Sequence, residues 1–254
     1  MTASLPMYDW PEVRAATDGL WAAVASRAGT DESLLRDGDH VAHWRRNGLL
    51  FSQTCGYPFT HEFDGRLTLV ATPHYGVDGC DGPLYQSIVL ARRKAPLEEF
   101  HGAVAAVNNP DSMSGMLALK LVFAPLARNG RFFGKSILSG GHIASLQAVR
   151  DGKADVCATD AVCVALARRY RPDYLEGLVE IGRGPMVPGL PFVTVAGNVA
   201  ALRQALADVF ADQASRAIRD HLFLTGFSIL EPRDYLAILE RERAMEKSGG
   251  LELL

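Results

Sequence analysis

Residues 103–128 read AVAAVNNPDSMSGMLALKLVFAPLAR and contain a strand, a turn and a helix in succession. The short apolar run 103–107 is typical of a buried strand, and the polar stretch 108–112 with its proline ends it. From 113 to 128 the pattern predicts a helix that is apolar nearly all round, so we expect it to be buried on several sides. This segment is therefore one strand–turn–helix unit.

The same alternation of short apolar runs and helical patterns continues on both sides of this unit. Clusters of Gly, Pro, Asn and Asp separate the elements, which indicates largely parallel sheets covered by helices on both faces. The sequence predicts strands at 49–53, 67–72, 86–91, 136–138, 155–159, 178–181 and 192–195, and helices at 9–28, 97–102, 142–150 and 161–170. Asp9 and Glu12 are spaced as a capping box for the first helix. The predicted fold class is α/β.

These units fall into three consecutive series along the chain, which predicts two lobes. The first and third series form one lobe, and the second series forms the other. The first lobe is discontinuous, at 1–92 and 190–254, and the second is inserted into it at 93–189. Two chain crossings between lobes would form a hinge. Ligands of such proteins bind in a cleft beyond the carboxyl ends of the strands.

Composition excludes several classes of protein. The 254 residues are 48% hydrophobic and 22% charged with a net charge of -3, so the chain reads as a globular protein without a nucleic-acid footprint. No uncharged apolar run approaches the ~20 residues that span a bilayer. The N-terminus has no basic or apolar signal region, so the sequence as written predicts a cytoplasmic protein, or a periplasmic one if a leader was removed.

The turn at 108–115 places hydroxyl groups at a predicted helix start. Backbone N–H groups of a first helical turn, joined by the hydroxyls of Ser112 and Ser114, form an anion site that needs no formal positive charge. The alternative is that Asp111 or Ser112 only caps the helix, as Asp and Ser commonly do.

Two further strand-to-helix turns carry polar residues. Gly140 and Gly141 permit close approach of a ligand, and His142 can donate to an anionic oxygen, although a lone histidine is more often a surface or capping residue. Asp160 either caps the next helix or points into the cleft. Because the three turns follow consecutive parallel strands, we expect them to converge at one rim of one sheet.

Three segments of the chain resemble the phosphate/phosphite/phosphonate ABC-transporter substrate-binding family. They are 109–115 (NPDSMSG), 139–145 (SGGHIAS) and 152–156 (GKADV), and the resemblance extends over most of the chain. It implies a two-lobed fold like that of type II periplasmic binding proteins, with oxyanion contacts from Ser112, Ser114 and His142. Met113 stands where the family often has Thr. The loss of that hydroxyl admits a more apolar or carboxylate-bearing ligand as an alternative to a phosphonate.

The opposite wall of the cleft is expected to come from strand ends of the first lobe. The candidates are Tyr8, Thr54, Tyr57 and Tyr75, because aromatic rings and hydroxyls suit an amphipathic ligand, although such rings also serve to pack loops. Cys55 and Cys80 are expected to be thiols in a reducing compartment.

These observations predict a solute-binding protein that closes on a small anionic ligand and works with an ABC permease. Catalytic templates are missing, since the sequence has no G-x-S-x-G elbow, Walker loop or H-E-x-x-H, so neither a cofactor nor a metal is expected. One alternative is a cytosolic lyase or biosynthetic enzyme on the same fold, with His142 or Asp160 as general acid or base. Another is a ligand-sensing module.

Overall fold

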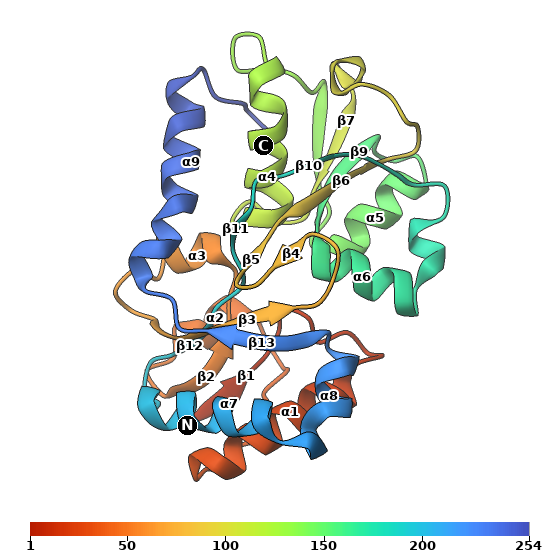
Figure 1. The fold of residues 1–254 in the computed structure, drawn as a ribbon. Coiled ribbons are helices and arrows are strands. Elements are labelled where there is room, and N and C mark those ends of the chain that lie inside the picture. Colours follow the sequence, from red (N-terminus) through yellow and green to blue (C-terminus); the bar gives the residue numbers. More distant parts are fainter. Residues whose placement is uncertain (254) are drawn as a thin grey trace. The chain divides into compact units, whose positions relative to one another are not determined.

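The computed structural model describes residues 1–253 and divides the chain into two compact units (Figure 1). Unit 1 comprises Met1–Gly76, Asp81–Pro83 and Pro188–Asp234. Unit 2 comprises Val77–Cys80, Leu84–Val187 and, within the described range, residues 235–253. The main differences from the predicted lobes are that strand β6 (Ser87–Ala91), helix α9 (Leu236–Lys247) and the short segment Val77–Cys80 lie in unit 2.

Unit 1 is built on a five-stranded sheet in the order β1-β2-β12-β3-β13. Strands β1 and β2 are parallel, whereas β12 is antiparallel to both β2 and β3, so β1, β2 and β3 point the same way. Strand β13 is antiparallel to β3. The strands are β1 (Thr2–Ser4), β2 (Leu49–Gln53), β3 (Thr68–Tyr75), β12 (Phe192–Thr194) and β13 (Leu224–Ser228).

Helices pack on this sheet through apolar stripes. Helix α1 buries Leu20, Trp21 and Val24, and it packs against α7, which packs on β3. Gly29 ends α1 with φ 73°, a left-handed conformation that glycine adopts without strain. The helices are α1 (Arg14–Ala28), α2 (His40–Trp44), α3 (Gly56–His61), α7 (Val199–Ala211) and α8 (Arg216–His221), with 3-10 turns at Gln213–Ser215 and Pro232–Tyr235.

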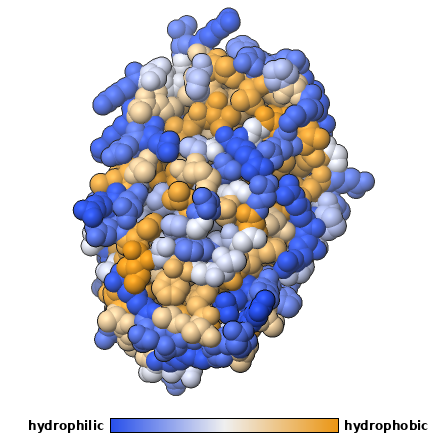
Figure 2. Space-filling model, in the orientation of Figure 1, coloured by the Kyte–Doolittle hydropathy of each residue, from blue (hydrophilic) through white to orange (hydrophobic). Residues whose placement is uncertain are grey.

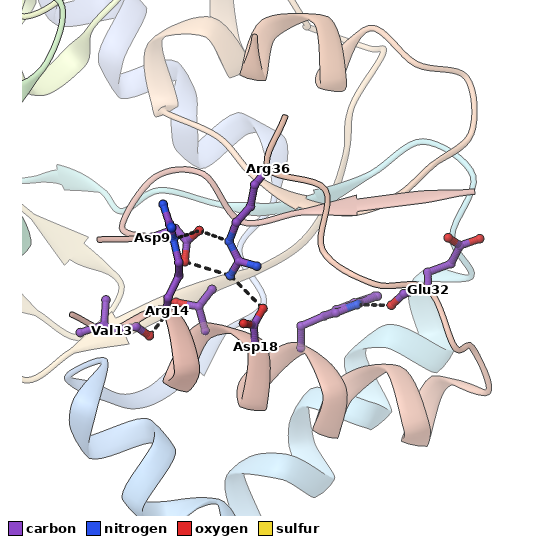
Figure 3. A network of polar contacts seen from close by, with 8 residues as sticks. Asp9, Val13, Arg14, Asp18, Glu32 and Arg36 are labelled. Carbon is purple, nitrogen blue, oxygen red and sulfur yellow. Dashed lines mark hydrogen bonds and ion pairs between the residues drawn. The ribbon is translucent and has the colours of Figure 1, made fainter. Parts of the chain in front are cut away.

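The predicted capping box of the first helix is wrong. Helix α1 starts at Arg14, and its N-cap Val13 has no side-chain cap. Asp9 instead binds Arg36, whose Nε lies 2.5 Å from Asp9 Oδ2 and whose NH2 group lies 2.8 Å from Asp18 Oδ1 (Figure 3). A hydrogen bond between a carboxylate and a guanidinium is stronger than one between a carboxylate and the N–H groups of an exposed helix end. Because Arg36 contacts both Asp9 and Asp18, it also ties the 29–39 loop to α1.

Unit 2 is built on a second five-stranded sheet, in the order β10-β6-β9-β7-β8. Strand β7 is parallel to both β8 and β9, whereas β6 is antiparallel to β9 and to β10. Strand β10 therefore runs in the same direction as β9. The strands are β6, β7 (Val104–Val107), β8 (Lys135–Leu138), β9 (Val156–Asp160) and β10 (Val179–Arg183).

The predicted helix at 113–128 is a composite of three helical types. A π-helical turn, η2 (Met113–Leu117), leads into α4 (Ala118–Phe123) and then into the 3-10 turn η3 (Ala124–Leu126). Pro125 has no backbone N–H, which explains why the regular helix stops before it. Leu117, Leu119 and Phe123 are fully buried, as the all-round apolar pattern predicts.

The other helices of unit 2 cover its sheet. Their bounds are α5 (His142–Arg150), α6 (Ala161–Tyr170) and α9, with 3-10 turns η1 (Leu97–Phe100) and η4 (Pro172–Leu175). Helices α5 and α6 coincide with the predicted ranges, and α9 packs against α4. A third, small sheet has the order β11-β5-β4, formed by Val187–Pro188, Leu84–Tyr85 and Cys80–Asp81.

The α/β fold class is confirmed, with sheets that are mixed rather than wholly parallel. Polar and apolar residues are interspersed on the face drawn in Figure 2, as expected for a globular surface. Within residues 1–253, no helix combines the length and the apolarity that crossing a bilayer requires.

Candidate ligand-binding residues of the two units

The turn after β7 places two serines at the start of the composite helix. Ser112 is its N-cap, and the backbone N–H of Gly115 donates to Ser112 Oγ at 3.0 Å. The N–H of Leu117 donates to the Ser112 carbonyl at 2.9 Å, which gives the turn its wider π-helical spacing. The N–H groups of Met113 and Ser114 precede this first helical bond, so they lie at the electropositive helix end.

The turn after β8 brings His142 into contact with the turn after β7. Because β7 and β8 are parallel neighbours, their carboxyl ends lie side by side, and α5 begins at His142. His142 Nε2 lies 2.8 Å from Ser114 Oγ. The hydroxyl of Ser139 donates to the Val107 carbonyl at 3.2 Å, which fixes the second turn against the first strand.

His142 is a neutral imidazole at physiological pH. Burial lowers its pKa from 6.5 to about 4. A neutral imidazole has one donor and one acceptor nitrogen. Nδ1 is buried and has no hydrogen-bond partner within the described part of the chain, while Nε2 is engaged with Ser114. The Ser114–His142 pair is therefore a cluster of neutral polar atoms.

Met113 and Asp160 are held by the fold of unit 2. Met113 is 1% exposed, so its side chain belongs to the core and only its backbone lies at the turn. Asp160 ends β9 and caps α6, since its Oδ1 accepts from the N–H of Val162 at 2.7 Å and of Cys163 at 3.4 Å. Of the two roles open to Asp160 in the sequence, capping is the one that the contacts display.

Asn108 is a polar residue of this turn that the sequence argument did not select. It follows β7 directly and is 6% exposed, and its Oδ1 has no hydrogen-bond partner among the described residues. A Cβ atom on Gly115 would lie 1.8 Å from that oxygen, so only glycine fits at this position. The sequence pattern that could have identified Asn108 is an asparagine at the end of a buried strand, with a glycine seven residues later.

In unit 1, Tyr8 and Tyr75 form one aromatic pair. Their ring centroids are 5.2 Å apart in an edge-on arrangement with an interplanar angle of 76°. Gln53, at the end of β2, donates from Nε2 to the Tyr75 hydroxyl at 3.1 Å and to the Leu190 carbonyl at 3.1 Å. Gln53 was not among the predicted residues, although it directly precedes Thr54.

Thr54 and Tyr57 lie in the loop and helix that follow β2. Thr54 is fully buried, its hydroxyl donates to the Cys55 carbonyl at 3.3 Å, and its N–H donates to Pro191. Tyr57 stacks on His61 with ring centroids 3.7 Å apart. The Thr54 hydroxyl is therefore engaged by a backbone carbonyl, and the position of Tyr57 is set by helix α3.

The four cysteines are free thiols. Cys55 and Cys80 are not joined in a disulfide. Burial raises the pKa of Cys80 to about 12, which keeps it protonated. In the range 1–253, no three His, Cys, Asp or Glu side chains are grouped so as to hold a metal ion.

Solved structures resemble the chain in fold over nearly its whole length. PhnD1 from Prochlorococcus marinus, solved in complex with methylphosphonate, has a TM-score of 0.76 and 14% identity, with 97% of this chain and 98% of that chain covered. A binding protein component of an ABC phosphonate transporter from Pseudomonas aeruginosa has a TM-score of 0.78 and 16% identity, over 97% and 87%. A Xanthomonas citri protein bound to chloride has a TM-score of 0.73 and 17% identity, over 98% of each chain.

Comparison by sequence gives the family. A search of curated proteins found no match. The family of periplasmic substrate-binding proteins of phosphonate ABC transporters matches residues 49–235, which include both serines, His142 and Tyr75. Since that range is most of the chain, the resemblance seen in the sequence is confirmed, and the protein belongs to the phosphonate ABC-transporter periplasmic substrate-binding family.

Proposed function

We propose that this protein binds a small oxyanion, with a phosphonate as the first candidate, through Ser112, Ser114, His142 and the N–H groups of the turn after β7. The observation that carries the proposal is the 2.8 Å contact between Ser114 Oγ and His142 Nε2, which joins two helix starts on neighbouring parallel strands. Hydroxyls, amides and a neutral imidazole at such a place suit an anion whose charge is spread over several oxygens.

The buried Met113 narrows the ligand class. A hydroxyl at this position would give the anion one more donor, whereas the methionine side chain lies in the core and contributes only its backbone N–H. With fewer donors, a ligand with fewer anionic oxygens or with an organic substituent is favoured over inorganic phosphate. PhnD1 from Prochlorococcus marinus was solved with methylphosphonate, which supports such a ligand here.

Unit 1 is proposed to supply the apolar part of the recognition. The Tyr8–Tyr75 pair offers ring edges and a hydroxyl, and Thr54 and Tyr57 lie in the adjoining segment. Asp160 is proposed to act near the ligand by holding the first turn of α6. Binding is proposed to close the two units on the ligand and to present the closed form to an ABC permease in the periplasm.

Calorimetry with defined anions tests the binding proposal. We expect methylphosphonate to bind more tightly than phosphate, and Ser114→Ala or His142→Gln to weaken methylphosphonate by about 10-fold or more, as expected for a hydrogen bond to a charged group. Ser136→Ala on β8 is the control and should bind like the wild type. Equal affinity in Ser114→Ala and the wild type would contradict the proposal.

Two further measurements address closure and chemistry. Small-angle scattering should show a smaller radius of gyration with saturating methylphosphonate. Native mass spectrometry of freshly purified protein should reveal any small molecule that copurifies. Incubation with methylphosphonate followed by phosphorus NMR should return the ligand unchanged, because a binding protein makes and breaks no covalent bond. Conversion of the ligand would favour the enzyme alternative.

A further inference from the structure

A groove in unit 1 lies between helix α1 and the extended segment 30–36. All of its lining residues are in unit 1, and none of them is among the residues proposed to bind the anion. Its volume of about 1010 Å³ is at the upper end of the range of roughly 300 to 1,000 Å³ that is usual for ligand pockets. The α1 wall is low because it consists largely of small residues, namely Ala22, Ala25, Ser26 and Gly29. The groove therefore has room for a stretch of backbone together with its side chains.

The opposite wall of the groove is an edge of the unit 1 sheet. Leu34, which lines the groove, forms a parallel bridge with Ala3 of β1, and the N–H of Leu35 donates to the Ala3 carbonyl at 2.8 Å. Because successive residues of an extended segment point their N–H and C=O groups in opposite directions, those of Leu34 point away from β1. Neither group has a hydrogen-bond partner within residues 1–253. Such an unpaired edge can accept a further strand.

The formal charge along the groove is mostly negative. The charged residues that line it are Asp18, Asp31, Glu32 and Arg36. The single guanidinium is turned to carboxylates, with Arg36 Nε 2.5 Å from Asp9 and its NH2 group 2.8 Å from Asp18 (Figure 3). Glu32 contacts the N-terminal amine at 3.0 Å, whereas Asp31 is exposed and has no ion-pair partner in the described part of the chain. An incoming segment would therefore meet carboxylates and no free cation.

We propose that this groove binds an extended segment of a partner protein that carries Lys or Arg side chains and adds as a strand beside Leu34. The inference goes beyond the proposed function and does not rest on it. An extended segment can pair with the Leu34 backbone groups, whereas a helix has its own backbone groups already bonded and would leave them unpaired. Basic side chains match the carboxylates of the groove, and acidic ones would be repelled.

Calorimetry with synthetic peptides tests the chemistry of the occupant. The probe is a seven-residue peptide with Lys and Val in alternation and capped ends, and its comparison has Glu in place of each Lys. We expect the lysine peptide to bind with a Kd below about 1 mM and the glutamate peptide to bind more weakly. Added salt should weaken the lysine peptide. Equal affinity of the two peptides, or no binding of the lysine peptide, would overturn the proposal.

Two pairs of variants test the place of binding. Ala22→Phe should abolish binding of the lysine peptide by filling the groove, whereas Ala15→Phe, at an exposed position of α1 outside the groove, should bind like the wild type. Asp31→Lys should weaken the peptide about 5-fold. Asp64→Lys makes the same change of charge at an exposed position of unit 1 outside the groove and should have little effect. Losses that are equal within each pair would place the peptide elsewhere and refute the groove as its site.

Amide exchange by NMR tests strand addition directly. Without peptide, the Leu34 amide should exchange quickly and the Leu35 amide slowly, since only Leu35 donates to β1. Saturating lysine peptide should protect the Leu34 amide, and Leu34→Pro, which lacks that N–H, should bind more weakly than the wild type. A Leu34 amide that stays unprotected with bound peptide would contradict strand addition.

Two further outcomes separate this inference from its rivals. Light scattering should show a monomer, and a dimer that Ala22→Phe dissolves would mean that a second copy of the chain occupies the groove, which would overturn the proposed partner. Methylphosphonate should bind Ala22→Phe as it binds the wild type. If methylphosphonate binds neither protein, the proposed function fails, while the lysine peptide still decides the present inference.

Discussion

Ser114 and His142, which come from two different strand-to-helix turns, are joined by a contact of 2.8 Å between Oγ and Nε2. Each residue stands in the first turn of its own helix, so the contact also joins two electropositive helix ends. The imidazole is neutral because burial lowers its pKa to about 4. The His142 imidazole therefore contributes to how stability responds to pH.

The free energy of unfolding should fall as the pH drops from 6.5 to about 4 through His142. In that window the unfolded chain binds a proton at this histidine and the folded chain does not, so acid favours unfolding, and the effect levels off below pH 4. The full loss is on the order of 3 kcal/mol. Urea unfolding between pH 7.5 and 4.5 should show a shallower decline for His142→Gln than for the wild type. Parallel declines would contradict the shifted pKa.

Gly115→Ala should destabilise unit 2 by about 2 kcal/mol or more, as overpacking in a core does. The added Cβ would lie 1.8 Å from Asn108 Oδ1 and 2.4 Å from Asn108 Cγ. Asn108→Ala removes both of those atoms, so the double variant should recover part of the loss in urea unfolding. Gly141→Ala is the control, because a Cβ there meets no atom within 4 Å. Absence of rescue would argue against the Asn108 contact as the cause.

Asp160→Ala should cost about 1 to 2 kcal/mol of stability through loss of the α6 cap, whereas Asp160→Asn should cost little. An asparagine oxygen can accept from the N–H groups of Val162 and Cys163 as the carboxylate does. Chemical denaturation gives the stability, and calorimetry with methylphosphonate gives the affinity. A large loss of affinity in the fully folded Asp160→Asn variant would assign this carboxylate a ligand contact beyond its cap.

Arg36→Met should destabilise unit 1 by about 1 to 2 kcal/mol, since it leaves the 11% exposed Asp9 with only the longer contact to Arg14 Nε, at 3.8 Å (Figure 3). Arg45→Met is the comparison, because Arg45 and Glu62 form a largely exposed pair that should contribute under about 1 kcal/mol. Thermal unfolding of both variants checks the order. Equal effects would mean that the Asp9 contact is no stronger than a surface ion pair.

Elements with a strong local pattern were predictable from the sequence. The bounds of β2, α5 and α6 coincide with the predicted ranges, because each is a clear apolar run or amphipathic helix between Gly or polar breaks. The convergence of three turns also follows from sequence, since β8, β7 and β9 are parallel neighbours. The Ser114–His142 contact is a direct consequence of that order.

Features that depend on distant partners were not predictable. Strand direction is one, because β6, β12 and β13 run antiparallel to their neighbours and a short apolar run has no direction of its own. The partner of Asp9 is another, since the capping-box spacing was present but Arg36, from a later loop, competes for the same carboxylate. The hydrogen bond from Gln53 to the Leu190 carbonyl is a third such feature, because the two residues meet only in the folded unit.

Neutral donors have a consequence for how an anion is selected. Hydroxyls, amides and an uncharged imidazole act over a few ångströms and carry no net charge that dissolved salt can screen. If the cluster around Ser114 binds the anion as proposed, its affinity should vary little with salt concentration, and discrimination among anions should rest on the spacing of their oxygens.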